Sequence, residues 1–480
     1  MSALTVLQSM ANFASIERTK KEAHIVAVPL PFKGHLVPLL EIVDRLSREG
    51  ISISVILTSD MHSFATSYGE LSHDCSTGLP IRLISLTDWD LAPGDHYDDG
   101  AGLDALQLRL DGLTAKIEDV LQKIQKEASS PQITCLLSDM GFYGAQELAE
   151  KFSINLVRYW HQSAASLCYY SCVAQGLQIP TDEHTIINCI PGAPPHTLSS
   201  VPTNLRPEIV GEIFFSSFLK PYKDVDNRVP IFLNTVEPME PEALKALRAQ
   251  GWNILCVGPL LHSMYSMRST SLCSPLKDRL GSHECLSWLD LKAEGSVLYV
   301  CFGTLFHLQK KEFEEVALGI EESNLSFLWS LHSDHVPGDC RSFLEGFIQR
   351  TKLRGLVLPW VPQLDVLSHR SVGGFLSHCG WNSTLESIYC GVPMIGRPVG
   401  ADQPLNLLCL CETWKMCLRL DGEIDKEKVK NTITDLFARN ELKDSADRLR
   451  DVIGEWCEKG YNTVSFEVLV RLIKDSESPK

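Results

Sequence analysis

Short apolar runs of strand length alternate with amphipathic stretches through the first half of the chain. Four runs rich in Ile, Val and Leu are each followed by polar or turn-forming residues, which is typical of strands in a parallel sheet: residues 24–30, 51–57, 133–137 and 154–159. After the first run the pattern predicts a turn over 31–35 and a helix over 38–48, with Pro38 near its start and Gly50 just past its end. A second helix is predicted between the third and fourth runs. Because strands and helices alternate, we expect a doubly wound α/β domain here.

The same alternation returns in the second half of the chain. Strands are predicted at 296–302, 327–331 and 372–376, and helices at 309–322 and from Trp381 onward. At 480 residues the chain exceeds what one hydrophobic core usually serves, so two domains are expected. The intervening Ser-rich stretch lacks a sustained period and is interpreted as a linker. The predicted division is a flexible leader at 1–22, a first domain at 23–258, the linker at 259–281 and a second domain at 282–480, whose final helix can pack back on the first domain.

Composition narrows the classes of function. The chain has 44 basic and 60 acidic residues and a net charge of −16, which argues against nucleic acid or an anionic membrane surface as partners. The N-terminus lacks the basic and apolar segments that export requires, and no apolar run approaches the ~20 residues of a membrane span. The 16 cysteines are therefore expected to be reduced, and pairs such as Cys409 and Cys411 lack a second ligand pair at zinc spacing. We expect a cytoplasmic monomer without a metal site.

Residues 360–403 combine the groups that a nucleotide-activated sugar requires. Trp360 offers a flat apolar face for a nucleobase, and Gln363 and Glu386 offer hydrogen-bonding groups for a ribose. A buried strand ends at Ser377 and His378, and Gly380 is expected to permit the tight turn into the helix that begins near Trp381. Backbone N–H groups at a helix start form a ready site for a diphosphate, which here would use Trp381, Asn382 and Ser383, with His378 as an additional donor.

Four polar residues lie at the carboxyl ends of predicted strands, where ligands bind in open α/β sheets. They are His35, Asp139, Thr304 and His378. We expect these strand ends to converge on a cleft between the two domains. A hydroxyl is a poor nucleophile until a base with a pKa near 7 takes its proton, and a histidine with a carboxylate partner meets that requirement.

The segment from Trp360 to Gln403 resembles the signature box of plant-type UDP-dependent glycosyltransferases, the family 1 enzymes with the GT-B fold of two Rossmann-like domains facing across a cleft. The resemblance includes its Pro-Gln, His-Cys-Gly-Trp-Asn-Ser, Gly-Val-Pro and Asp-Gln elements in register. It extends to PLPFKGHLVPL, LLSDMGFYGAQELAEKF, FLNTVEPMEPEAL and VLYVCFGTL, and so covers nearly the whole chain. Departures are Cys301 in place of Ser, Ser377 in place of Thr, and Val399-Gly400-Ala401 in place of a segment that frequently holds an aromatic residue.

The resemblance implies a role for each matching residue. His35 would deprotonate the acceptor hydroxyl, and Asp139 would orient it and stabilise the imidazolium. For the donor, Trp360 would stack on uracil beside the Val361 backbone, Gln363 and Glu386 would hold the ribose, Thr304, His378, Asn382 and Ser383 would bind phosphates, and Trp381, Asp402 and Gln403 would bind sugar hydroxyls.

The function implied is inverting transfer of a sugar, with glucose expected from Gln403, from a UDP-sugar to a hydroxyl or carboxyl of a small, largely apolar acceptor such as a phenolic, flavonoid or terpenoid. The UDP-sugar is a co-substrate, and no cofactor is expected. A non-catalytic UDP-sugar sensor remains an alternative, against which the presence of both His35 and Asp139 weighs. A hydrolase or acyltransferase using Cys379 or Ser383 lacks a Gly-x-Ser-x-Gly turn, and a dehydrogenase lacks a Gly-x-Gly-x-x-Gly after any strand.

The acceptor pocket is where sequence patterns give least. Its wall is expected to come from segments near 89–106, 161–179 and 191–216, for which no pattern specifies an acceptor. Phe142, Trp160 and Tyr169 are candidate wall residues, and each is equally compatible with core packing.

Overall fold

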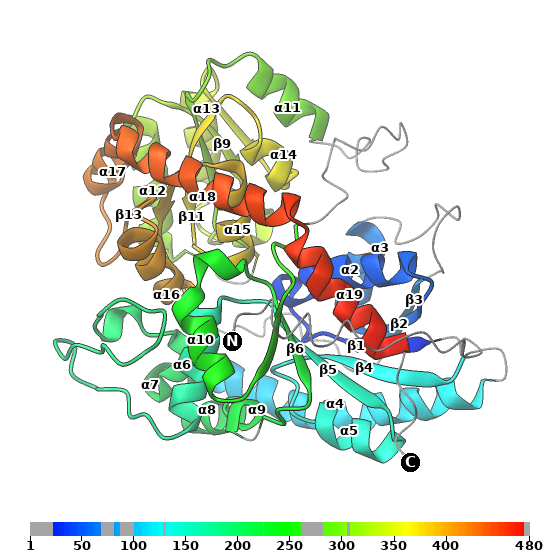
Figure 1. The fold of residues 1–480 in the computed structure, drawn as a ribbon. Coiled ribbons are helices and arrows are strands. Elements are labelled where there is room, and N and C mark those ends of the chain that lie inside the picture. Colours follow the sequence, from blue (N-terminus) through cyan, green and yellow to red (C-terminus); the bar gives the residue numbers. More distant parts are fainter. Residues whose placement is uncertain are drawn as a thin grey trace.

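The computed structural model describes residues 23–68, 81–86, 100–127, 131–223, 225–261, 282–304 and 308–474. The predicted leader at 1–22 and most of the predicted linker, 262–281, lie outside these residues. Figure 1 shows two lobes, each built on its own sheet. Neither lobe contains, within the described ranges, a helix long and apolar enough to cross a membrane.

The first domain is built on a seven-stranded, wholly parallel sheet with strand order β3-β2-β1-β4-β5-β6-β7. Its strands are β1 (His24–Val28), β2 (Ser52–Thr58), β3 (Ile81–Leu86), β4 (Ile133–Asp139), β5 (Asn155–Trp160), β6 (Pro230–Leu233) and β7 (Asn253–Cys256). Its helices are α2 (Lys33–Arg48), α3 (Ser59–Tyr68), α4 (Gly100–Lys126), α5 (Ala145–Phe152), α6 (Ala164–Ala174), α7 (Pro207–Val210), α8 (Glu212–Phe218), α9 (Lys220–Lys223) and α10 (Pro241–Ala249).

The second domain is built on a six-stranded parallel sheet with strand order β10-β9-β8-β11-β12-β13. Its strands are β8 (Val297–Cys301), β9 (Ser326–Ser330), β10 (Gly355–Leu358), β11 (Val372–Ser377), β12 (Met394–Gly396) and β13 (Cys417–Arg419). The helices that follow the first domain are α11 (Ser282–Asp290), α12 (Lys310–Glu322), α13 (Arg341–Thr351), α14 (Gln363–Leu367), α15 (Trp381–Cys390), α16 (Gln403–Leu408), α17 (Lys426–Ala438), α18 (Asn440–Glu458) and α19 (Tyr461–Lys474). The α/β prediction with two doubly wound domains is confirmed.

Strand periodicity explains how each sheet buries both faces. In β1, Ile25 and Ala27 pack in one core with α2, while Val26 and Val28 pack in another with α4 and α5, because successive side chains point to opposite faces. The second sheet repeats the arrangement. Leu298 and Val300 of β8 face the core that includes α12 and α17, while its other side chains face α15 and α18.

The start of α2 differs from the prediction. The helix begins at Lys33 rather than near Pro38, so His35 lies in its first turn and not in a preceding turn. Pro38 is tolerated inside the helix because the carbonyl of Gly34, which a Pro38 N–H would otherwise have reached, instead accepts a hydrogen bond from Asn382 Nδ2 at 3.0 Å. A residue of the second domain thus satisfies a backbone group in the first.

Three indole N–H groups join the domains. Trp381 donates to the carbonyl of Asn234 at 2.7 Å, Trp456 to that of Gly258 at 3.2 Å, and Trp414 to that of Met239 at 3.4 Å. The surrounding aromatic bodies are buried in a core cluster that spans both domains. Tryptophan suits such positions because it buries a large apolar surface and still offers a donor.

The last helix leaves the second domain. α18 runs along the second domain, and α19 then lies against the first (Figure 1). Phe466, Leu469, Val470 and Ile473 are buried in the same core as β1, β2 and α2, and Lys474 Nζ donates to the carbonyl of Glu49 at 2.8 Å. The first sheet therefore has one of its faces completed by the final residues of the described chain.

Candidate active site

The predicted site residues lie at the points where each sheet reverses its strand order. In the first sheet β1 and β4 are neighbours, and the chain continues from β1 toward one edge, through β2 and β3, and from β4 toward the other edge, through β5, β6 and β7. His35 follows β1, and Asp139 ends β4. In the second sheet the corresponding pair is β8 and β11, after which Thr304 and His378 follow. Reversal points leave a crevice outside the strand ends, where ligands of doubly wound proteins bind.

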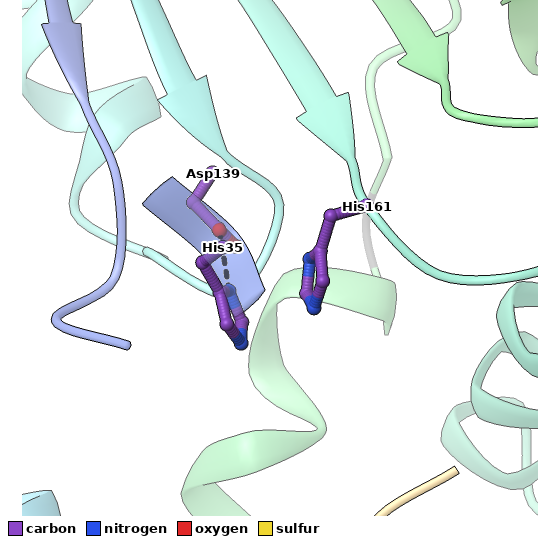
Figure 2. A group of neighbouring side chains, drawn as sticks. All are labelled: His35, Asp139 and His161. Carbon is purple, nitrogen blue, oxygen red and sulfur yellow. Dashed lines mark hydrogen bonds and ion pairs between the residues drawn. The ribbon is translucent and has the colours of Figure 1, made fainter. Parts of the chain in front are cut away.

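His35 and Asp139 form a direct pair, shown in Figure 2. The distance from His35 Nδ1 to Asp139 Oδ2 is 2.7 Å, with 18% of the histidine side chain exposed and 1% of the aspartate. The second carboxylate oxygen, Oδ1, accepts from the backbone N–H of Gly141 at 2.8 Å. Tyr159 donates its hydroxyl to the carbonyl of His35 at 3.0 Å and thereby anchors the start of α2.

The negative charge of Asp139 determines which ring nitrogen of His35 carries the proton. Burial raises the pKa of the carboxyl, but the neighbouring His35, with smaller contributions from His161 and the Gly141 N–H, outweighs burial and lowers it to about 2. Asp139 is therefore ionised and can only accept, so Nδ1 of His35 carries the proton. The lone pair is left on Nε2, which is the arrangement that a general base requires.

A second histidine lies beside this pair. The ring centroids of His35 and His161 are 3.5 Å apart, and Figure 2 shows the two rings side by side. His161 follows β5, the strand next to β4, and is buried; burial, together with His35, holds its pKa well below the usual value. Its Nδ1 atom is buried, and no described residue forms a hydrogen bond with it.

The start of α15 presents the predicted phosphate site. Gly380 precedes the helix, and Trp381, Asn382 and Ser383 form its first turn. The left-handed residue of the turn is Cys379, at φ 64°, and not Gly380 as expected. Gly380 is needed for a different reason, because a Cβ atom there would lie 2.5 Å from Nε2 of His378.

Three buried polar atoms at this helix start have no partner within the described structure. They are Nδ1 of His378, Oδ1 of Asn382 and Oγ1 of Thr384. Burial lowers the pKa of His378 to about 4, with a hydrogen bond to the Cys301 backbone acting in the opposite direction, so its imidazole is neutral and carries a single N–H. The Trp381 indole N–H is already used at the domain interface, which leaves only the backbone of this residue for a ligand.

The predicted ribose residues are already in contact with one another. Gln363 Nε2 donates to Glu386 Oε2 at 2.5 Å and to Ser383 Oγ at 2.9 Å, and Tyr299 donates its hydroxyl to Gln363 Oε1 at 3.0 Å. Burial raises the pKa of Glu386 to about 7, with the Gln363 hydrogen bond acting in the opposite direction. The site thus holds a carboxyl poised between its two protonation states.

Asp402 directly precedes α16 and Gln403 is its first residue, and both are buried. Burial raises the pKa of Asp402 to about 6, and Asn406 donates to it at 2.8 Å. Gln403 Oε1 accepts from the backbone N–H groups of Val399 at 2.7 Å and Gly400 at 3.0 Å. Its amide nitrogen is the part that remains for a sugar hydroxyl.

The remaining predicted residues are more dispersed. Trp360 is half-buried before α14, Val361 is buried, and Thr304 is exposed. Of the candidate acceptor residues, Phe142 is buried in the core under α4 and α5, and Trp160 and Tyr169 are buried in the core that spans both domains, where the Tyr169 hydroxyl contacts His196 at 3.2 Å. These environments favour packing over ligand contact for all three.

The geometry does not support the alternative of a hydrolase or acyltransferase with Cys379 or Ser383 as the nucleophile. The thiol of Cys379 is buried and donates to the carbonyl of Ser377 at 3.8 Å, while the hydroxyl of Ser383 accepts from Gln363. In the described part of the chain, neither has a hydrogen bond to a histidine that could activate it.

His161 is the residue that sequence reasoning placed only at the boundary of an acceptor segment. The signal was available, since His161 directly follows the strand that pairs with β4. Adjacent parallel strands end at the same edge of a sheet, so a residue after β5 lies near the residue that ends β4.

Comparisons with known proteins identify the family and the fold of this chain. A family model described as UDP-glucoronosyl and UDP-glucosyl transferase matches residues 117–453. A UDP-glycosyltransferase of Arabidopsis thaliana is 30% identical over 485 residues, covering 95% of this chain and 97% of its own, and a flavonol 3-O-glucosyltransferase of Actinidia chinensis var. chinensis is 30% identical over 478 residues, covering 96% and 99%. The crystal structure of an anthocyanidin 3-O-glucosyltransferase in complex with UDP superposes with a TM-score of 0.78 at 25% identity, covering 95% of this chain and 100% of that one.

Proposed function

Since the chain belongs to the UDP-glucoronosyl and UDP-glucosyl transferase family and is a UDP-glycosyltransferase with the GT-B fold, we propose that its donor is UDP-glucose and that His35 is its general base. The observation that carries the proposal is that each sheet has functional groups at the point where its strand order reverses. The His35–Asp139 pair lies at one, and the N-terminus of α15 lies at the other. The hydrogen bond from Asn382 to Gly34, the residue before His35, brings the two together.

The proposed reaction is a single displacement. Nε2 of His35 takes the proton of an acceptor hydroxyl as its oxygen bonds to C1 of the sugar, and the bond from C1 to the UDP oxygen breaks, which inverts the configuration at C1. The imidazolium that forms is stabilised by the ionised Asp139. The charge that develops on UDP is met by the backbone N–H groups of α15 and by the neutral imidazole of His378.

We assign the remaining contacts of the UDP-sugar to polar groups of the donor site. Glu386 and Gln363 would hold the ribose hydroxyls, and Trp360 would cover the uracil beside the Val361 backbone. The second N–H of Asn382 Nδ2 and the hydroxyls of Ser383 and Thr304 would complete the phosphate contacts. Asp402, the Gln403 amide nitrogen and the Trp381 backbone would bind the sugar hydroxyls. The protein would need no cofactor beyond this co-substrate, and we propose that it works as a monomer in the cytoplasm.

For the acceptor we propose a small, largely apolar molecule with a hydroxyl, such as a phenolic, flavonoid or terpenoid alcohol. The matched relatives named for flavonols and anthocyanidins support the phenolic class. The described segments that would surround an acceptor include the one that carries the aromatic group of Phe214, Phe218 and Tyr222. This apolar surrounding favours an acceptor without net charge.

The test is a panel of phenols, flavonoids, terpenoid alcohols and carboxylic acids with UDP-glucose, run on the native protein and on His35→Ala. The native protein should glucosylate at least one class, and His35→Ala should lower turnover on an alcohol by at least ~100-fold, within the usual contribution of a general base. UDP affinity measured by calorimetry should barely change. Near-full turnover of the variant on an alcohol would reject His35 as the base.

A further inference from the structure

His35, Asp139 and His161 form a compact set of metal-binding atoms. One ring nitrogen from each histidine and one carboxylate oxygen all lie within 4.8 Å of one another (Figure 2). Within the described residues this is the one group of three or more His, Cys, Asp or Glu side chains with donor atoms so close. Two imidazoles and a carboxylate are donors that suit zinc and neighbouring transition metals, and not magnesium or calcium.

The spacing of the two rings fits a shared ion. Zinc–nitrogen bonds are about 2.0–2.1 Å long, so two nitrogens on one tetrahedral ion lie about 3.3 Å apart. The rings of His35 and His161 are tilted by 39° with centroids 3.5 Å apart, and one nitrogen of each lies within 4.8 Å of the other and of a carboxylate oxygen of Asp139, so side-chain movements alone would bring the three atoms onto one ion. The ligands would come from three separate segments, the start of α2, the end of β4 and the residue after β5, and the backbone around them is fixed by the sheet.

Burial and charge also favour a cation here. His161 is 7% exposed, and its buried Nδ1 atom has no hydrogen-bond partner among the residues that the structure describes. Asp139 is fully buried, and Asp402 is close enough to interact electrostatically with His35. The buried guanidinium of Arg158 donates to the carbonyls of Met140 and Phe142 and also interacts electrostatically with Asp139.

We propose that His35, Asp139 and His161 form an inhibitory site for a zinc-class divalent cation. The proposal rests on the proposed role of His35 as the base. If the ion binds Nε2 of His35, it takes the lone pair that would accept the hydroxyl proton. If it binds Nδ1, the proton of Nδ1 moves to Nε2, which again leaves no lone pair for the acceptor. Either geometry stops transfer without any change in the donor site.

The first experiment measures inhibition of the native protein by Zn²⁺ and by Mg²⁺ at saturating UDP-glucose. Zn²⁺ should inhibit and Mg²⁺ should not, and a chelator should restore activity. His161→Gln should raise the zinc concentration for half inhibition at least ~10-fold, because loss of even an outer-shell group weakens metal sites by that factor. The matched control is His332→Gln, which removes an exposed histidine that also lies near an aspartate and should leave the zinc sensitivity unchanged.

The second experiment measures binding without activity. Co²⁺ added to the native protein should give d–d absorption bands without the intense charge-transfer band of a thiolate ligand, and His161→Gln should lose these bands. The thiolate comparison matters because the chain contains 16 cysteines. Equal zinc sensitivity in His161→Gln, or a thiolate-type cobalt spectrum, would overturn the proposal. Cobalt binding that depends on His161 together with full activity of His35→Ala would instead preserve the metal site and reject the proposed base.

Discussion

Replacing Asp139 with asparagine tests the centre of the mechanism, because the structure gives this carboxylate two simultaneous donors. Oδ2 accepts from His35 Nδ1 at 2.7 Å and Oδ1 accepts from the Gly141 N–H at 2.8 Å. An asparagine has one acceptor and one NH₂ group. If its oxygen stays on Gly141, its NH₂ faces Nδ1, and His35 must carry its proton on Nε2 to accept that hydrogen bond. The base is then held in the wrong tautomer.

The other orientation of the asparagine is also costly. Its oxygen would keep His35 in place, but its NH₂ would face the Gly141 N–H in a buried position, and the imidazolium would lose its counter-charge. A hydrogen bond to a charged group contributes ~1.5–3 kcal/mol, which corresponds to ~10–150-fold in rate. Trapping of the tautomer adds to this loss, so we expect kcat to fall by ~10²–10⁴ in Asp139→Asn.

The assay is steady-state turnover of an alcohol acceptor at saturating UDP-glucose, with UDP affinity measured in parallel. A phenol that ionises by itself should recover part of the lost rate as pH rises through its own pKa, while an alcohol should not. Glu240→Gln is the matched control, since Glu240 is also buried and accepts two backbone N–H groups, from Ala164 and Ala165, at the start of α6. That variant should lose thermal stability without a comparable loss of kcat. Near-native kcat in Asp139→Asn would refute the reasoning.

Three further outcomes are expected. Glycosyl transfer should survive an excess of chelator, because the donor site consists of a helix start, His378 and hydroxyls; loss of activity that Mg²⁺ or Mn²⁺ restores would contradict this. In a competition of equal UDP-glucose, UDP-galactose, UDP-xylose and UDP-glucuronate, glucose should be preferred, and Gln403→Ala should weaken its use by ~1–3 kcal/mol through the lost hydrogen bond. Gln403→Glu keeps the acceptor for the Val399 and Gly400 N–H groups, replaces the amide donor with an acceptor oxygen and adds a negative charge, so a fully active Gln403→Glu would exclude a sugar contact that depends on the amide N–H. Glu386→Gln should raise the melting temperature of the ligand-free protein and weaken UDP binding. The folded pKa of Glu386, about 7, lies above the ordinary 4.5, so native stability falls as pH rises between these values, by at most ~3 kcal/mol; a melting-temperature gain that does not grow from pH 5 to pH 8 would reject this sign.

Strand positions were accessible from sequence because each strand is an apolar run bounded by turn residues. The predicted run at 133–137 and the observed β4, Ile133–Asp139, differ only at the polar end, where Ser138 and Asp139 still pair with β5. The start of α2 was missed because Pro38 is usual in the first turn of a helix. Pro38 can lie further inside the helix because Asn382, some 340 residues away in sequence, donates a hydrogen bond to the Gly34 carbonyl. No local pattern contains that information.

The candidate site likewise has features that could be predicted from the sequence and features that could not. Proximity of His35 to Asp139, and of His378 to the start of α15, follows from strand ends at reversal points and was predictable. The direct contact between the rings of His161 and His35 was not predictable, because neighbouring strand ends fix proximity but not the orientation of two rings. The roles of the donor residues stay predictions, as does glucose as the sugar.

The placement of α19 has a consequence for how the protein is made. Phe466, Leu469, Val470 and Ile473 complete a core whose other members lie mostly before residue 260. During synthesis, about 200 further residues must leave the ribosome before this helix exists, which takes on the order of 10–40 s at 5–20 residues per second. Throughout that interval the face of the first sheet that α19 covers is exposed to water, to chaperones and to other nascent chains. A truncation or a bulky fusion near Lys474 should therefore reduce the yield of folded protein by acting on the first domain, although the altered residues follow the second.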